Sequence, residues 1–338
     1  MNYSYYIGLD ISKEWFDAAI LRSKTPNKTM SHHRFDNNKE GFKAFVNWLK
    51  KVGITDLSSI LVCMEHTGLY SVKISLFLGE EKITYTLVPG IAISNSLGIS
   101  RSGNDKLDAK RISRYAFKNK YEIRIHTLPV EAIRELKTLL SYRERLVKSR
   151  HGLKVSLKEL RAHESQNIIN SIYESSQKMI DELTEEMKKV RKAITEVMKN
   201  NPAIKRNYDL LLSVPGIGDQ NTLYMIVLTK NFVSFNCPKK FSTYSGIVPF
   251  KKKESGKSIT SKSRISHLAN KKMKSLLTSA VVTSLSHCSE YRLYYERQIA
   301  RGKNENSVKN VLRNKIVSRA FAVIKRGTPY IDTHAFAS

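Results

Sequence analysis

Short apolar runs and stretches of helical period alternate over the first third of the chain. Three segments of strand length lie at residues 5–10, 15–21 and 29–35, the first two mostly apolar, with the short gaps that are typical of hairpins. Two further runs, at 59–64 and 83–88, are mostly apolar and predict buried strands. The pattern therefore begins with three strands close together and continues with two that lie farther apart.

Stretches of helical period separate and follow the later strands. Residues 39–52 carry apolar side chains at helical spacing, and helices are also predicted around 70–78 and 106–117. Three consecutive strands followed by alternating helices and strands is the element order of an RNase H-like fold. We therefore predict an α/β domain over residues 1–125.

The middle of the chain, residues 126–204, has the pattern of long helices. After Gly152 it contains no glycine or proline until Pro202. Its first half has apolar residues at spacings of three, four, six or seven: Ile133, Leu136, Leu140, Leu146, Leu153, Leu157 and Leu160. With a polar stretch near 163–170, this pattern predicts two helices in an antiparallel or coiled-coil-like pair. The pair is either an interdomain spacer or an oligomerisation arm.

The last third of the chain is also predicted to be helical. We expect a compact helical domain over residues 205–300 and a basic helical tail over 301–338. The predicted fold class is thus α/β followed by all-α.

The charge balance indicates a polyanionic partner. The 338 residues include 58 Lys and Arg against 30 Asp and Glu, a net charge of +28, which is too large for a typical metabolic enzyme. Residues 1–90 hold 11 basic and 9 acidic residues, whereas residues 239–275 hold 11 basic residues and one acid. We therefore expect a near-neutral domain that carries out chemistry and a basic domain that binds nucleic acid.

Cysteine usage and hydropathy exclude several other classes of protein. Cys63, Cys237 and Cys288 are widely spaced and fit neither a disulfide framework nor a zinc site. No run of about 18 apolar residues predicts a membrane span, and the N-terminal residues lack a signal-peptide pattern. We expect a protein of a reducing cytoplasm with no membrane partner.

Four acids fall where the predicted elements would bring them together. Asp10 and Glu65 come at the ends of two strands, and Asp105 and Asp108 lie three residues apart at the start of a helix. In an RNase H-like arrangement the first and fourth strands are neighbours and the later helix packs across them. Carboxylates that repel one another require a cation, and oxygen ligands favour Mg²⁺, so the four acids predict a magnesium site for phosphodiester chemistry.

Each acid alone also has a structural explanation. Asp105 suits the first turn of a helix, and an acid at a strand end is often a solvated turn residue. Only the joint placement favours a metal site. Two other polar residues nearby, Asp17 and His66, are expected at the protein surface.

A turn between two apolar helical segments has the pattern of a helix-hairpin-helix motif. Its residues are Pro215, Gly216, Ile217 and Gly218. The glycines leave backbone N–H groups bare at the start of the following helix, where they can contact phosphate without reading bases. An ordinary interhelix turn is the alternative.

Basic residues surround several serines between residues 241 and 279. The basic side chains expected to contact nucleic acid are Lys251, Lys252, Lys253, Lys257, Arg264, Lys271 and Lys272. A serine among cations is suited to attack phosphorus, because the cations stabilise the developing negative charge. Ser255 is one candidate nucleophile, and spacing alone does not separate it from three others: Ser258, Ser261 and Ser263.

Segments in both halves of the chain resemble one family. The N-terminal YIGLDISKE, CMEHTGLY and NDKLDAKRI, and the later LLLSVPGIG and YSGIVPF…ESGKS…ISHLANKKMKSLL, carry the resemblance. They are similar to the RuvC-like and C-terminal transposase domains of the IS110 group of insertion-sequence DEDD transposases, which act as bridge-RNA-guided recombinases. The resemblance covers roughly residues 4–125 and 205–290.

The resemblance implies roles for the candidate residues. The four acids of the family fall on Asp10, Glu65, Asp105 and Asp108, and its nucleophilic serine falls on Ser255. The family has Ser-Gly-Gly at this point, whereas this chain has a lysine in place of the second glycine. The implied reaction is strand exchange through a 5′-phosphoserine, with Mg²⁺ bound by the acids.

The resemblance also implies partners and location. These are donor and target DNA, a structured noncoding guide RNA (the bridge RNA) that pairs with both, and further copies of the chain in a dimer or tetramer. The expected location is the bacterial cytoplasm, in association with the nucleoid.

Two other functions are compatible with parts of the sequence. A metal-dependent nuclease of the Holliday-junction type needs the acids but not Ser255. A non-enzymatic RNA-binding protein needs neither, and the complete set of four acids argues against it.

Overall fold

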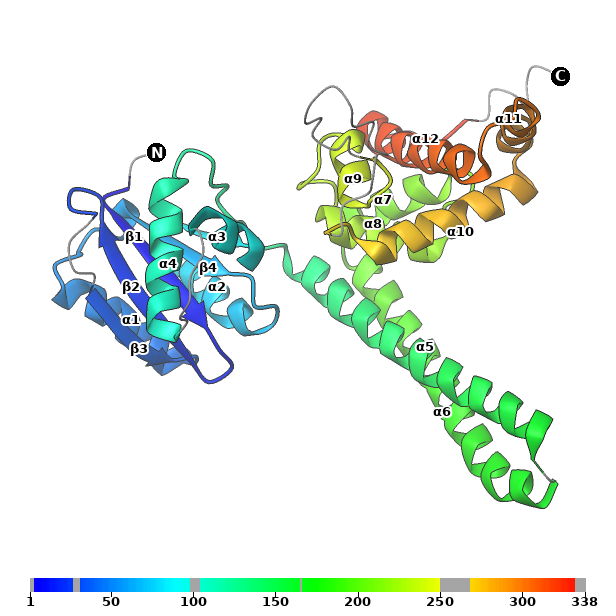
Figure 1. Ribbon diagram of the computed structural model, residues 1–338, viewed down its shortest axis with the longest axis horizontal. Coiled ribbons are helices and arrows are strands. Elements are labelled where there is room, and N and C mark those ends of the chain that lie inside the picture. Colours follow the sequence, from blue (N-terminus) through cyan, green and yellow to red (C-terminus); the bar gives the residue numbers. More distant parts are fainter. Residues whose placement is uncertain (1–2, 27–30, 98–103, 165, 250–267, 332–338) are drawn as a thin grey trace, which may run out of the picture. The chain divides into compact units, whose positions relative to one another are not determined.

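A computed structural model describes residues 3–26, 31–97, 104–164, 166–249 and 268–331. The chain divides into two compact units, Met1–Leu128 and Pro129–Ser338 (Figure 1). Each unit has its own hydrophobic core.

The first unit is built on a five-stranded mixed sheet in the order β3-β2-β1-β4-β5. Its strands are β1 (Tyr5–Ile11), β2 (Trp15–Arg22), β3 (Ser31–Asp36), β4 (Ile60–Glu65) and β5 (Tyr85–Val88). The first three strands pair antiparallel, whereas β4 and β5 are parallel to β1. All five predicted strands are confirmed, and β1 and β4 are neighbours as the RNase H-like element order predicted.

Helices cover both faces of this sheet. On one face α1 (Lys39–Lys51) and α2 (Tyr70–Glu80) enclose a core with Ile7, Leu9 and Val62. The other face is covered by α3 (Gly90–Leu97) and α4 (Asp105–Lys118), and its core includes Tyr6, Leu61 and Cys63. A short 3₁₀ turn, Leu57–Ser59, leads into β4. The sequence did not predict α3, which has only eight residues.

The packing of α4 on the sheet depends on Gly8 in β1. A Cβ atom at this position would lie 2.1 Å from the Ala109 carbonyl oxygen and 2.4 Å from the Ser113 nitrogen, both in the backbone of α4. Because no side chain fits between them, the helix backbone lies directly against the strand (Figure 1). Cys63 is the neighbour of Gly8 on β4 and is fully buried beneath the same helix face.

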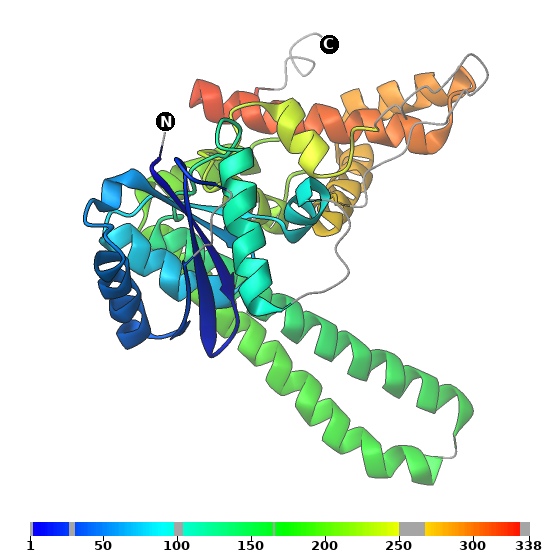
Figure 2. The same ribbon diagram turned by 60° about the vertical axis from the view of Figure 1, so that its left-hand side comes forward.

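The second unit begins with two long helices, α5 (Glu131–His163) and α6 (Gln166–Lys199). They run antiparallel and side by side in both views (Figures 1 and 2). Leu136 and Leu140 of α5 are buried in the same core as Val190 and Ile194 of α6. The prediction of two long paired helices is confirmed, while a coiled-coil interface stays a prediction.

The remaining helices form a compact bundle. They are α7 (Pro202–Leu212), α8 (Asp219–Thr229), α9 (Pro238–Tyr244), α10 (Lys271–His287), α11 (Ser289–Ala300) and α12 (Glu305–Arg326). Residues 301–338 were predicted as a basic helical tail, and α12 is that helix; it packs against α7, α9, α10 and α11, and Leu312, Ile316 and Val317 are fully buried. The apolar face of α12 thus completes the core, although its other positions are strongly basic. No helix among the described residues is long and apolar enough to cross a membrane.

We predict that Gly8→Ala destabilises the first unit by about 1–3 kcal/mol or more, because the added Cβ pushes α4 away from β1. Gly79→Ala is the matched control, since a Cβ there would meet only Leu128, at 3.9 Å. In helix α2 that change should be stabilising by about 0.5–1 kcal/mol. Both tryptophans of the chain, Trp15 and Trp48, lie in this unit, so tryptophan fluorescence during urea unfolding measures its stability selectively. Equal stabilities for the two variants would contradict the role given to Gly8.

Candidate active site

A row of charged side chains crosses the sheet on the face covered by α4. Successive residues of a strand point to opposite faces, so Asp10 points to the same face as Gly8 and Tyr6. Asp10 is paired directly with Asp17 of β2, which in turn is paired with Arg34 of β3.

Glu65 extends this row on the other side of β1. Leu9 is paired with Met64 in the parallel ladder, so the next residues along the two strands are Asp10 and Glu65. The carboxylate of Glu65 lies against Gly90 at the start of α3, where a Cβ would be only 2.2 Å from its Oε1 atom. Gly90 therefore leaves the space that this carboxylate occupies.

The other two predicted acids come from the first turn of α4. The side chain of Asn104 caps the helix by accepting a hydrogen bond from the Leu107 nitrogen, at 2.8 Å. Asp105 and Asp108 follow on the same side of the helix, and their charges are favoured by its dipole. Since the contact at Gly8 fixes α4 against β1, this first turn lies close to Asp10.

The electrostatics of Asp10 show that the four acids are gathered. The pKa of Asp10 is raised to about 6, first by burial and then by the charges of Asp108, Asp105, Glu65 and Asp17, in that order of effect. The structure thus brings the other three predicted acids within electrostatic reach of Asp10. Negative charge at this edge of the sheet is only partly offset by the protein itself.

Asp17 is a member of the cluster that the sequence analysis missed. It was expected at the surface, but it is only 1% exposed. Its carboxylate accepts hydrogen bonds from His32 Nε2 at 2.6 Å and from Arg34 Nε at 2.9 Å. The sequence does contain an indication that Asp17 is buried, because this acid lies in the middle of the apolar run that forms β2.

Arg34 connects this buried acid to the helix. Its Nη2 atom lies 2.7 Å from Asp105 Oδ2, and its guanidinium group lies 5.1 Å from the centre of the Trp15 ring. Trp15 Nε1 also approaches Asp105 Oδ2, at 3.5 Å. One guanidinium group therefore joins a buried carboxylate to one of the predicted metal ligands.

The acids suit a divalent cation by their chemistry. Carboxylate oxygens are hard ligands, and the raised pKa of Asp10 indicates that a cation would be bound favourably here. In this conformation Asp105 is paired with Arg34 and Asp108 with Arg111, at 2.6 Å. Among the described residues, accordingly, no group of three His, Cys, Asp or Glu side chains is already arranged to ligate a metal.

The turn predicted to contact phosphate packs partly inside the second unit. Gly216 has a φ of +83° and faces α10, where a Cβ would lie 1.9 Å from Ser284 Oγ. Pro215 is half-buried and Ile217 is buried, whereas Gly218 is exposed and caps the start of α8. Packing against α10 is thus sufficient to explain why residue 216 is a glycine, without any contact to phosphate. At Gly218, by contrast, a Cβ would meet nothing within 4 Å, so no packing contact requires this glycine.

Two of the predicted basic contacts lie at the start of α10. Lys271 is exposed, and Lys272 pairs with Glu144 of α5 at 3.4 Å and lies over the ring of Tyr224. Lys272 therefore holds α10 to the helical arm. The other predicted residues of this region lie outside the described residues: Lys251, Lys252, Lys253, Ser255, Lys257 and Arg264.

We predict that Asp10→Asn stabilises the first unit at neutral pH. A carboxyl group whose pKa is raised by folding destabilises the fold once it ionises, so wild-type stability should fall as the pH rises from about 4 to about 6. Removing the charge should restore about 1–2 kcal/mol, after allowance for solvent screening of a half-buried group. The measurement is urea unfolding by tryptophan fluorescence at several pH values in a metal chelator.

Asp56→Asn is the matched control for this prediction. Hydrogen bonds from Ser58 lower the pKa of Asp56, so the loss of its charge should leave stability unchanged or reduce it. If Asp10→Asn were no more stable than Asp56→Asn at neutral pH, the acids would not repel one another as described.

Comparison with known proteins identifies the family. A family model described as "Transposase" matches residues 7–162, and one described as "Transposase IS116/IS110/IS902 family" matches residues 208–296. The first match contains all four acids, and the second contains the turn and the basic loop. The match to the first model also implies dependence on a divalent metal.

Two similar proteins span almost the whole chain, and a third covers part of it. A "Pilin gene-inverting protein" of Moraxella bovis is 26% identical over 96% of this chain and 97% of its own length. The protein of the same name from Moraxella lacunata is also 26% identical, over 96% of this chain and 97% of its own length. An IS110 insertion-element protein of Streptomyces coelicolor is 28% identical over 36% of this chain and 29% of its own length. The chain therefore belongs to the IS110 family of transposases, a family of DNA-recombining enzymes.

Proposed function

We propose that this protein exchanges DNA strands between a donor site and a target site through a covalent link to Ser255. The observation that carries the proposal is the gathering of Asp10, Glu65, Asp105 and Asp108 at one edge of the sheet, with the pKa of Asp10 raised to about 6. Carboxylates that repel one another destabilise the fold, and such arrangements are typical of functional sites. Phosphodiester chemistry requires a site of this kind, because it uses metal ions that carboxylates bind.

The four acids would bind Mg²⁺ and orient the scissile phosphate. When bound, the metal supplies charge stabilisation for the attacking and leaving oxygens of the phosphodiester. Asp10, on the rigid central strand, fixes the position of the site, and Asp105 and Asp108 approach it from the first turn of α4.

Ser255 would be the nucleophile. Its Oγ atom loses its proton and attacks phosphorus, the bond from phosphorus to the 3′ oxygen breaks, and that strand leaves as a 3′-hydroxyl after taking up a proton. A 3′-hydroxyl from the other site then attacks the 5′-phosphoserine, which frees the serine and joins the strands. The lysines near Ser255 would stabilise the phosphorane-like charge.

The net charge of +28 supports binding to nucleic acid over a broad surface. We propose that a structured noncoding guide RNA pairs with donor and target DNA and that the protein acts as a homo-oligomer, a dimer or a tetramer. The exposed pair of helices α5 and α6 is suited to join protomers. DNA inversion, by analogy with the pilin gene-inverting relatives, is the kind of rearrangement that we expect.

A metal-dependent nuclease is the second candidate. It is favoured by the same cluster of acids, which needs no serine for hydrolysis by water. The two functions differ in one product, because only the recombinase forms a covalent bond between protein and DNA.

We predict that Ser255→Ala and Asp10→Ala each reduce recombination by about a thousandfold or more, because each removes a group that acts in the chemical step. The assay combines purified protein, the noncoding RNA that flanks its gene, Mg²⁺ and end-labelled donor and target DNA. A denaturing gel should show a protease-sensitive DNA–protein adduct with the wild type and none with either variant.

Ser258→Ala is the matched control for the serine and should form the adduct normally. Normal recombination by Ser255→Ala would refute its assignment and make Ser258 the next candidate. Cleavage without an adduct would favour the nuclease, and RNA binding without cleavage would favour the non-enzymatic alternative.

We predict that Arg34→Gln increases the affinity of the site for Mn²⁺. Loss of the ion pair leaves Asp105 without its cation, which should strengthen metal binding about fivefold. Arg22→Gln is the control on the same sheet, because its guanidinium donates to the Val52 carbonyl oxygen and not to the acids. Calorimetric titration measures the affinity, and tryptophan fluorescence without metal checks folding. Weaker Mn²⁺ binding by Arg34→Gln would contradict this role.

A further inference from the structure

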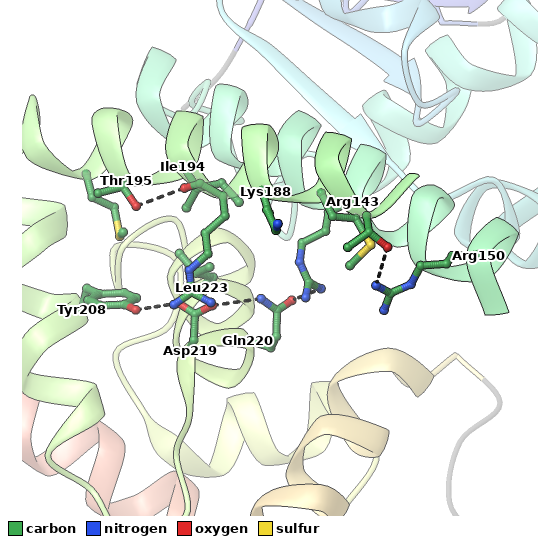
Figure 3. A pocket seen from close by; sticks show the side chains of 13 residues that line it. Arg143, Arg150, Lys188, Ile194, Thr195, Tyr208, Asp219, Gln220 and Leu223 are labelled. Carbon is green, nitrogen blue, oxygen red and sulfur yellow. Dashed lines mark hydrogen bonds between the residues drawn. The ribbon is translucent and has the colours of Figure 1, made fainter. Parts of the chain in front are cut away.

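A basic cavity lies in the second unit, where the root of the α5–α6 arm meets α7 and α8. Its volume is about 240 Å³, enough for a phosphate group with its water molecules but small for a larger ligand. Figure 3 shows Arg143, Arg150 and Lys188 extending from the two arm helices toward the space beside α8.

The charge of the cavity lining is strongly positive. Four cationic side chains line it, Arg143, Arg150, Lys188 and Arg191, against one carboxylate, that of Asp219. Asp219 already accepts hydrogen bonds from Tyr208 and Gln220, at 2.6 Å and 3.2 Å (Figure 3). Lys188 is paired with Glu185 at 2.7 Å, so the excess positive charge of the cavity comes from its three arginines.

Two of the arginines are oriented by neutral partners. Arg143 Nη1 donates to Gln220 Oε1 at 2.9 Å, and Arg150 Nη1 donates to Thr184 Oγ1 at 3.2 Å. In the part of the chain that the structure describes, neither guanidinium group forms an ion pair with a carboxylate. A guanidinium group has five N–H donors, so each retains donors for a ligand while its direction is fixed.

The position of the cavity favours a ligand on a nucleic acid strand. Gln220 lies in the first turn of α8, two residues after the exposed cap residue Gly218 and next to Asp219, so the cavity adjoins the helix start that follows the turn. Planar arginine groups with free donors bind phosphate oxygens in pairs. A nucleic acid strand that contacts the start of α8 could thus place one of its backbone phosphates in the cavity.

We propose that this cavity binds a backbone phosphate of a nucleic acid, with Arg143 and Arg150 as its charged ligands. The proposal rests on the proposed action on nucleic acid but not on the chemical steps at the sheet. It makes the root of the helical arm a contact point for DNA or for guide RNA, two sources of the same phosphate chemistry.

The test is the affinity of the full-length protein for short fluorescent oligonucleotides, single- and double-stranded, of DNA and of RNA. The double variant Arg143→Gln/Arg150→Gln should bind at least one probe about tenfold more weakly. The slope of log affinity against log salt should also become shallower by about 1, because one phosphate contact is lost. The probe that is affected identifies the source of the phosphate.

The control Arg145→Gln removes the same kind of charge from the same helix. Arg145 is exposed, lies near the ring of Tyr142 and does not line the cavity, so its affinity and salt slope should stay close to the wild type. Thermal unfolding checks the fold of each variant. If the double variant fails to fold, the exposed cavity residue Arg191 is changed to Gln, and binding about threefold or more weaker is expected.

The outcomes separate this proposal from the proposed function. If the wild type bound no probe, the proposed action on nucleic acid would fail. If the wild type bound but the cavity variants matched Arg145→Gln in affinity and salt slope for every probe, the phosphate site would be refuted.

Discussion

The close contact between the backbone of α4 and Gly8 determines the geometry of the acid cluster. Strand β1 supplies Asp10, two residues after Gly8, and α4 supplies Asp105 and Asp108 in the turn before the contact at Ala109. A helix held off by even one methyl group would carry both of its acids away from the sheet. A residue with no side chain thus controls where the charged side chains meet.

The cluster is electrostatically unfavourable, and its surroundings offset part of that cost. Asp10 is held among like charges that raise its pKa, while Asp17, one strand away, is satisfied by His32 and Arg34. Arg34 also reaches Asp105, so the protein supplies one cation to a site that suits a metal ion. Positions where the fold tolerates such repulsion are characteristic of functional sites.

Local patterns in the sequence were sufficient to predict the strands, the long helices and the positions of the four acids on these elements. Apolar runs identify the strands, and the acids follow at their ends or in a first helical turn. Asp17 was missed because its partners, His32 and Arg34, come from another strand, and burial of an acid depends on such partners. The packing of Gly216 against α10 and the burial of α12 could not be predicted either, because both depend on contacts between residues that are distant in sequence.

Cys63 gives the contact at Gly8 a chemical consequence. It sits beside that glycine beneath α4, and burial raises the pKa of its thiol to about 12, so it remains protonated and sheltered from oxidants and alkylating reagents. Only a separation of helix from sheet would expose the sulfur. The rate at which Cys63 is alkylated therefore measures how often the acid cluster comes apart.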